Sequence, residues 1–207
     1  MKALCEQAVT ARFADRALLI RPGLIVGPHD PTQRFTYWPA RVARAADAEP
    51  VLVHVAVGDS VQFIDARDLA AFVLRASDDG SQGPFNLVSA PRALTMSAVL
   101  EACAAAAGTR PRWQWTNAKD VERCGLKAWS DLPLWLPADG DHAAFGLTET
   151  CAATAAGLTI RPLAQTVAET LAWYRSLPLD RQAFTKARMS SEREALALSQ
   201  SGAGAGV

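Results

Sequence analysis

The sequence has no excess of charge of either sign. Its 207 residues include 21 lysines and arginines and 21 aspartates and glutamates, for a formal net charge of 0. Proteins that bind nucleic acid or an anionic membrane through their overall charge carry a basic excess, so we expect neither partner. The apolar stretches are far shorter than a membrane span, and residues 1–7 contain no signal-peptide apolar region. We therefore expect a cytoplasmic protein.

Cysteine and histidine are scarce and scattered. No two of the four cysteines have the spacing of a metal site, and four in a chain of this length do not indicate a disulfide framework. The three histidines are isolated, which argues against zinc. We therefore expect no metal, and cysteines that act as small buried apolar residues. The cysteines are Cys5, Cys103, Cys124 and Cys151.

Hydrophobic patterning predicts an α/β protein. Apolar residues at helical spacing indicate helices at about 2–13, 34–46, 67–77, 95–107, 117–125, 148–156 and from Pro162 onward. Short apolar runs indicate strands at 17–22, 51–56, 61–65, 84–88 and 112–115. Glycine and proline indicate a loop at 23–30 and a turn at Gly58-Asp59, and 126–147 is irregular.

Several helix ends carry residues that favour those ends. Gly108 has the position of a helix-terminating glycine, and Asn117 is a candidate N-cap with Asp120 three residues later. Pro162 is expected in the first turn of its helix. Beyond Pro178 the chain becomes more polar, and Ser191 and Glu194 have the spacing of a capping box for a last short helix. We expect the Gly/Ala-rich end to be disordered.

Two of the expected strands, 17–22 and 84–88, are continuous apolar runs. Such runs are typical of parallel strands that are buried on both faces. Two strands of this kind do not make a self-sufficient sheet, because each needs neighbours at its edges and helices on both faces. We therefore expect the remaining strands of the sheet to precede Met1.

Segments in a fixed order resemble the extended short-chain dehydrogenase/reductase family, of the NAD-dependent epimerase/dehydratase type. Lys2–Glu6 looks like the end of its Tyr-x-x-x-Lys motif, and Arg21–Pro28 looks like the strand and loop beside the nicotinamide and the substrate. Val61–Ala70 resembles a later strand-to-helix segment, and Gly83–Leu87 resembles the final core strand. The helices at 95–100 and 162–173 resemble its closing helices, so the likeness covers about residues 2–175.

The resemblance implies a fold and a domain organisation. Residues 1–178 would be the C-terminal portion of an NAD(P)-binding Rossmann-like fold, together with a small mixed α/β substrate-binding region. Residues 179–207 would be a polar tail with a short helix. The resemblance is also compatible with a homodimer.

The resemblance further implies an oxidoreductase that uses NAD or NADP. In this family a tyrosine is the general acid/base, and the lysine beside it holds the nicotinamide ribose and lowers the pKa of the tyrosine. Lys2 matches that lysine and is the catalytic candidate. Pro22, Gly23, Leu24 and Ile25 would lie at the nicotinamide.

The sequence also departs from the family. It contains no Gly-x-x-Gly-x-x-Gly fingerprint for the pyrophosphate, and the tyrosine would lie two residues before Met1. Leu24 and Val61 stand where nucleotide-sugar members carry an asparagine and a diphosphate-binding arginine. Because a diphosphate needs such donors, we expect a small or apolar carbonyl or alcohol substrate instead. The candidate substrate-binding residues are Leu24, Arg34, Tyr37, Trp38 and Arg41.

Simpler interpretations remain open at each of these positions. Lys2 could be a solvated lysine, Tyr37 and Trp38 could pack in the core, and Arg34 and Arg41 could be surface charges. At the level of the whole protein, the alternative to an enzyme is a non-catalytic remnant that serves as a binding module. The coding DNA upstream of Met1 discriminates between the two, since only the enzyme needs the fingerprint and the tyrosine there. As it stands, we expect the chain to be inactive alone.

Overall fold

Parallel strand pairs organise the chain. The computed structural model describes residues 1–54, 60–137 and 140–202. In it, β1 (Leu18–Pro22) pairs with β5 (Gly83–Leu87), β2 (Leu24–Val26) pairs with β4 (Phe63–Asp65), and β3 (Pro50–His54) pairs with β6 (Arg112–Thr116). All three pairs are parallel, with Leu18 opposite Gly83, Leu24 opposite Phe63, and Pro50 opposite Arg112.

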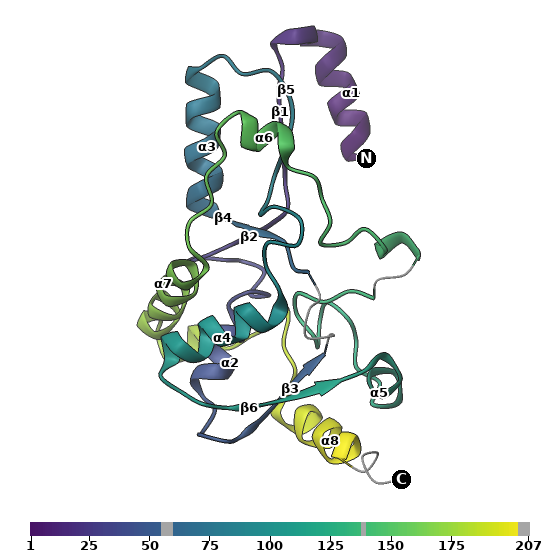
Figure 1. The fold of residues 1–207 in the computed structure, drawn as a ribbon, viewed down its shortest axis with the longest axis vertical. Helices are drawn as coiled ribbons and strands as arrows, with labels where there is room; N and C mark the ends of the chain where they lie inside the picture. The colour runs from purple at the N-terminus through teal and green to yellow at the C-terminus, as the bar shows by residue number, and fades with distance from the viewer. Residues whose placement is uncertain (55–59, 138–139, 203–207) are drawn as a thin grey trace.

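One part of the molecule is built on β1 and β5 (Figure 1). Helices α3 (Ala66–Asp78) and α6 (Cys151–Ala155) lie beside this strand pair, and they share a small apolar core with it. Helix α1 (Lys2–Phe13) precedes β1 through a short 3₁₀ turn at Ala14–Arg16 and has no buried residue. The core consists of Ile64, Phe72, Ala76, Phe85, Leu87 and Ala153.

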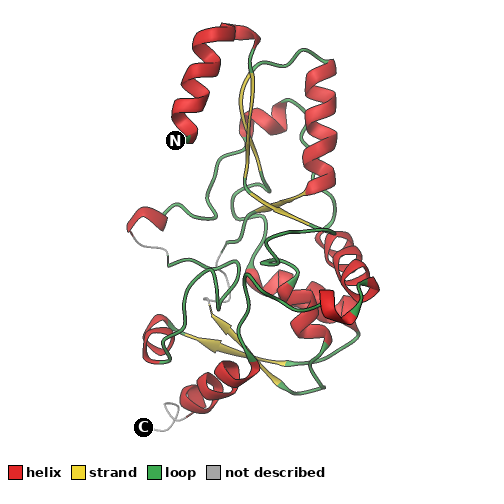
Figure 2. Cartoon of the chain, turned by 180° about the vertical axis from the view of Figure 1, so that it is seen from behind, coloured by secondary structure: helices red, strands yellow, loops and turns green. Residues whose placement is uncertain are grey.

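The larger apolar core lies in the other part, which Figure 2 shows from behind. Helices α2 (Tyr37–Ala43), α4 (Met96–Ala107) and α7 (Leu163–Ser176) pack on one another there, and β3 contacts α8 (Ser191–Gly202). Helix α5 (Ala118–Arg123) packs on α8 as well. Short 3₁₀ turns occur at Gly140–His142 and Leu179–Arg181.

Most of the expected elements are present. The two apolar runs form β1 and β5, which pair with each other, although the residues of β1 are at most half-buried in this chain. The Thr95 hydroxyl accepts a hydrogen bond from the backbone N–H of Ala98 at the start of α4, and Gly108 ends α4 with a φ of 71°. Asn117 caps α5 through the N–H of Asp120, as expected.

Several expectations differ from the structure. Of the four cysteines, which we expected to be buried, only Cys103 is buried. Part of the expected loop at 23–30 is the strand β2, which is too short between Gly23 and Gly27 to give a periodic signal. Helices α2 and α6 are shorter than expected. Pro162 is the N-cap of α7 rather than its first residue. The expected turn at Gly58-Asp59 and the expected disorder of residues 203–207 lie outside the described residues.

The segment after Pro178 packs into the molecule, although we expected a polar tail there. Phe184, Met189 and Ala197 belong to the larger core. Its helix does form, but Ser190 and not Ser191 caps it, because the Ser190 hydroxyl accepts a hydrogen bond from the N–H of Arg193. The side chain of Glu194 points away from the helix N-terminus and reaches Arg41 and the N–H of Leu52.

Gly23 is required by packing between β1 and the residue after β5. A Cβ atom on Gly23 would lie 2.6 Å from Cγ2 of Val88, closer than atoms can approach. We therefore expect Gly23→Ala to destabilise the protein by about 1–3 kcal/mol, as overpacking commonly does. Thermal melting would measure the loss, and adding Val88→Ala should restore part of it. A Gly23→Ala protein as stable as the parent would contradict the close approach.

Candidate functional site

The candidate residues of the N-terminal part gather at the carboxyl end of β1. Helix α1 runs antiparallel to β1, so the start of the helix and the end of the strand lie at the same end of that part (Figure 1). Arg21 in β1 donates a hydrogen bond from Nε to Oε1 of Glu6 at 2.9 Å and forms a second contact with the other carboxylate oxygen. Lys2 lies about one helical turn before Glu6, at the exposed start of the same helix.

The stretch from Pro22 to Ile25 is largely exposed. Pro22, Gly23 and Ile25 are exposed, and Leu24 is half-buried in β2. The backbone N–H of Gly23 donates to the carbonyl of Leu87 at 3.1 Å. A Cβ atom at position 23 would collide with Val88, so packing within the protein already requires a glycine there. Roles for these residues and for Lys2 in cofactor binding stay predictions.

A loop at 27–36 follows β2 at its carboxyl end. His29 and Gln33 both have a left-handed φ, 69° and 61°, which is uncommon for residues other than glycine. Asp30 is buried, and its Oδ1 accepts hydrogen bonds from the N–H and the hydroxyl of Thr32, each at 2.8 Å. Gln33 is bonded to the carbonyl of Ala183 and to the N–H of Thr185, so residues 183–185 hold the loop in this shape. Sequence analysis did not identify Asp30 or Gln33.

Tyr37 and Trp38 lie in the larger core. Each side chain is 2% exposed, and the Trp38 indole N–H donates to the carbonyl of Pro133 at 2.9 Å. Burial raises the pKa of Tyr37 well above its ordinary value, and the negative charge of Glu194 adds to that effect. These positions favour a packing role, and direct contact of either ring with a substrate stays a prediction.

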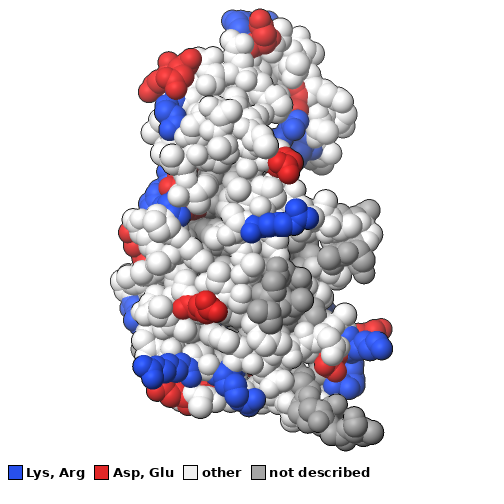
Figure 3. Space-filling model, viewed as in Figure 1, with Lys and Arg blue, Asp and Glu red and all other residues white. Residues whose placement is uncertain are grey.

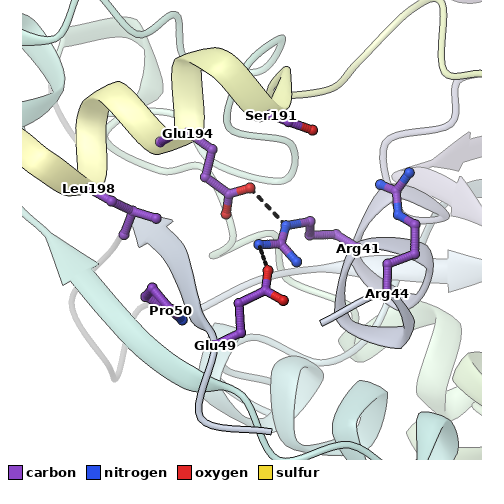
Figure 4. A pocket seen from close by; sticks show the side chains of 8 residues that line it. Arg41, Arg44, Glu49, Pro50, Ser191, Glu194 and Leu198 are labelled. Carbon is purple, nitrogen blue, oxygen red and sulfur yellow. Dashed lines mark hydrogen bonds and ion pairs between the residues drawn. The ribbon is translucent and has the colours of Figure 1, made fainter. Parts of the chain in front are cut away.

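Arg41 is held by two carboxylates at a surface cavity of about 340 Å³ (Figure 4). Its Nε donates to Glu194 at 2.8 Å and an Nη donates to Glu49 at 2.9 Å. Burial alone lowers the pKa of Arg41, but the hydrogen bonds and charges of the two glutamates outweigh it and raise the pKa. Because two carboxylates already compensate its charge, Arg41 is a weak candidate for binding a substrate.

A second cavity, of about 200 Å³, lies where β4 meets the start of α7. Its apolar wall includes Phe63 and Leu163, and Asp65, Asp68 and Arg161 supply its charged side. Arg161 binds Asp68 at 2.8 Å, and the Asp65 carboxylate accepts hydrogen bonds from Arg67 and from the Thr166 hydroxyl. The charged groups of this cavity are therefore satisfied within the protein.

Asp65 is expected to make stability depend on pH. Burial raises the pKa of Asp65, but hydrogen bonds from Arg67 and Thr166 and the charge of Arg161 outweigh it and lower the pKa. A carboxylate with a lowered folded-state pKa stabilises the fold above its unfolded pKa of about 3.9, and that contribution is lost as the pH falls through the folded pKa. At pH 7, Asp65→Asn should therefore lower the melting temperature while still capping α3. The difference should shrink below about pH 4, and a difference that is constant with pH would contradict this assignment.

Other ligand classes find little support on the surface. Figure 3 shows Lys and Arg interspersed with Asp and Glu on the face in view, without a broad field of one sign. Among the described residues, no group of three or more histidines, cysteines, aspartates or glutamates is placed to hold a metal ion. In the same part of the chain, no helix has the length and apolar character to cross a membrane.

Comparisons with known proteins find matches among solved structures alone. No protein-family model matches the sequence, and no curated protein sequence matches it. RMD from Pseudomonas aeruginosa complexed with NADPH matches with a TM-score of 0.52 and 18% identity, over 85% of this chain and 53% of that chain. UDP-glucose 4-epimerase from Thermus thermophilus in complex with NAD matches with a TM-score of 0.55 and 18% identity, over 85% and 52%.

A GDP-L-fucose synthetase from Naegleria fowleri also matches, with a TM-score of 0.53 and 16% identity, over 84% of this chain and 50% of that chain. The chain thus spans about half the length of the solved structures that it matches. At this level of identity the likeness is one of fold. The α/β fold expected from the sequence is therefore confirmed, and it is similar to part of the Rossmann-like fold of NAD(P)-dependent epimerases and related enzymes.

Proposed function

We propose that this chain forms the part of an NAD(P)-dependent oxidoreductase that carries the active-site lysine and the substrate-binding region. The observation that carries the proposal is the exposed ion pair between Glu6 and Arg21, which joins the first half of α1 to the carboxyl end of β1. Ligands of parallel α/β folds bind outside the carboxyl ends of the strands. Two of the solved structures with a similar fold are complexes with NADPH and NAD.

The residues present fit the nicotinamide end of such a cofactor. Lys2 is exposed and forms no ion pair in the described part of the chain, so its ammonium group is available as a hydrogen-bond donor. Pro22 to Ile25 offer exposed backbone at the same end. The sequence contains no glycine-rich turn for the pyrophosphate, so that end would need residues outside these 207.

Each residue has a defined task in this proposal. Lys2 donates hydrogen bonds to ribose hydroxyls, and its positive charge favours the ionised form of a neighbouring tyrosine. Leu24 places an aliphatic side chain on the substrate side, and Val61 stands where nucleotide-sugar members of the resembled family carry an arginine, so a diphosphate would lack hydrogen-bond donors there. The substrate is therefore a small or apolar carbonyl compound or alcohol. The hydride chemistry belongs to the nicotinamide.

The proposal also includes a cytoplasmic location and a homodimer. For the first, the absence of a basic excess argues only against binding to an anionic membrane surface. Exposed apolar side chains on α1 support the second, because Leu4 is 66% exposed and Phe13 is 46% exposed. Light scattering on the purified protein would detect the dimer.

The test is to express the reading frame extended upstream of Met1 and to measure the oxidation of NADH and NADPH. The expected result is turnover with a panel of small apolar ketones and aldehydes, and weak or no turnover with nucleotide sugars. The 207-residue chain alone should bind either cofactor more weakly than micromolar, which calorimetry would measure. A stop codon directly upstream, or an extended protein that binds neither cofactor, would overturn the proposal in favour of a non-catalytic binding module.

A further inference from the structure

Polar atoms without partners concentrate in one loop. Among the described residues, the buried side-chain nitrogens and oxygens without a hydrogen-bond partner are Oδ2 of Asp30, Nε of Arg34 and Oγ1 of Thr36. All three belong to the loop at 27–36, whose last residue, Thr36, is the N-cap of α2. Buried polar groups in proteins are nearly always hydrogen-bonded, and of these three exceptions only Arg34 carries a positive charge that a bound anion would offset.

Arg34 stands out among the half-buried arginines that the structure describes. The other five each bind a carboxylate or backbone carbonyls: Arg41 with Glu49 and Glu194, Arg67 with Asp65, Arg75 with Ala156 and Gly157, Arg161 with Asp68, and Arg193 with Asp131. The guanidinium of Arg34 has no such partner in the described residues.

Asp30 lies in the same loop but does not neutralise Arg34. Its Oδ1 is occupied by Thr32, its Oδ2 has no partner, and the described residues show no ion pair between Asp30 and Arg34. Withdrawing an arginine partly from water without a counter-charge costs free energy, and a bound anion would offset that cost.

The surroundings of Arg34 are aromatic. Its guanidinium carbon lies 5.0 Å from the centre of the Trp129 ring, over its face. Phe145 meets Trp129 edge to face, with ring centres 5.4 Å apart, and is itself 38% exposed. An arginine whose flat face rests on an aromatic ring keeps its N–H edge for a carboxylate, and the adjacent ring can contact a planar apolar body.

The position of this group agrees with a ligand site. The loop begins directly after β2, which is parallel to β4, and crevices at the carboxyl ends of parallel strands are where α/β proteins bind ligands. The left-handed residues His29 and Gln33 keep the loop in a shape that most residues disfavour. Such strain is retained where the surrounding structure fixes it, and Gln33 is fixed here by residues 183–185.

We propose that Arg34 binds a carboxylate group of the substrate, and that Trp129 and Phe145 contact the planar apolar body that carries it. The substrate class is thus an aromatic or conjugated carboxylic acid with a reducible or oxidisable group. That the substrate carries a reducible or oxidisable group rests on the proposed oxidoreductase function. The carboxylate site itself needs no cofactor.

Benzoate and its uncharged analogue benzamide are the probes for this site. Both have the same planar ring, but benzamide lacks the negative charge with which Arg34 would pair. We expect the 207-residue chain to bind benzoate in the millimolar range, and about tenfold or more tighter than benzamide at low salt, because hydrogen bonds to a charged group are the stronger kind. Ligand-observed NMR would measure both affinities without cofactor.

Variants assign the preference to Arg34. Arg34→Gln should bind the two probes about equally, and Arg34→Lys should keep part of the preference, because it retains the charge but not the planar fork. Arg44→Gln is the matched control, since Arg44 is an exposed arginine without an ion pair in the described residues, and it should bind benzoate like the parent. Melting curves would verify that each variant is folded. If Arg34→Gln is not folded, the comparison is made with Arg34→Lys instead.

Three results would overturn the assignment. They are equal binding of the two probes by the parent, an undiminished preference in Arg34→Gln or Arg34→Lys, and no detectable binding of benzoate. Because the cofactor is absent from these measurements, a failure here leaves the oxidoreductase proposal standing. Conversely, an extended protein that binds no cofactor would leave a carboxylate site found with benzoate unchanged.

Discussion

Replacing Glu194 by alanine is expected to destabilise the protein by about 2–4 kcal/mol, because Nε of Arg41 and the N–H of Leu52 both lose their acceptor, although Glu49 still pairs with Arg41. The side chains of Arg41 and Glu194 are 11% and 7% exposed, and their Nε–Oε2 distance is 2.8 Å. The other oxygen of Glu194 accepts the backbone N–H of Leu52 at 3.1 Å. One side chain therefore joins α8 to both α2 and β3, and its loss affects all three.

Thermal and denaturant unfolding would measure this effect, and the melting temperature should fall by about 10 °C. Glu101→Ala is the matched control, because Glu101 is an exposed helical glutamate, and it should change stability by less than about 0.5 kcal/mol. The double variant Arg41→Met/Glu194→Leu removes both buried charges and should recover part of the loss, because the N–H of Leu52 stays without its acceptor. If the Glu194→Ala protein had the same melting temperature as the parent, the last helix would not be held by Glu194.

The role of Glu194 could not be predicted from the sequence. Ser191 and Glu194 have the spacing of a capping box, so the local pattern assigns the carboxylate to its own helix terminus. In the structure, Glu194 instead binds partners 142 and 153 residues earlier in the chain. Local periodicity contains no information on such distant pairs, which is why the packing of the segment after Pro178 was not predicted either.

The strands show where sequence patterns are sufficient. The apolar runs at 17–22 and 84–88 predicted β1 and β5, because each is long enough and bounded by turn residues. Strand β2 has three residues between two glycines and forms through its pairing with β4, so tertiary structure determines it. Likewise, the close contact between Gly23 and Val88 depends on the pairing of β1 with β5, which no local pattern around position 23 predicts.

The candidate substrate residues show the same limit. Arg34, Tyr37, Trp38 and Arg41 lie within eight positions and are equally plausible as ligand contacts in the sequence. The structure separates them by their partners, since both rings are in the core and Arg41 is bound by two glutamates. Arg34 alone of the four lacks a hydrogen-bonding partner for its side chain in the described residues. The partners of each arginine come from chain segments that are distant in sequence. No motif around positions 34–41 therefore predicts which arginine has a partner.

In the extended protein that we propose, Lys2→Met is expected to lower kcat by about 10²–10⁴-fold, the usual loss when a well-placed acid/base contribution is removed. Lys2 is the residue that resembles the family lysine, and the Glu6–Arg21 ion pair joins its helix to β1. Without the ammonium charge the pKa of the neighbouring tyrosine rises, so less of its ionised form is present at neutral pH. The apparent affinity for the cofactor should fall as well, because the ribose loses a hydrogen-bond donor.

Steady-state kinetics across pH would separate this role from a structural one. With Lys2→Met, the alkaline shift of the pH–rate profile should accompany the loss in kcat, whereas a merely destabilised protein would lose activity without that shift. Lys119→Met is the control, since Lys119 is an exposed lysine on α5, and its kinetics should match those of the parent. Glu6→Gln should produce a smaller loss of the same kind, because Lys2 keeps its charge but its helix is held less firmly. Near-normal kcat and cofactor affinity in Lys2→Met would show that Lys2 is not the family lysine, and the assignment of the N-terminal helix would then be wrong.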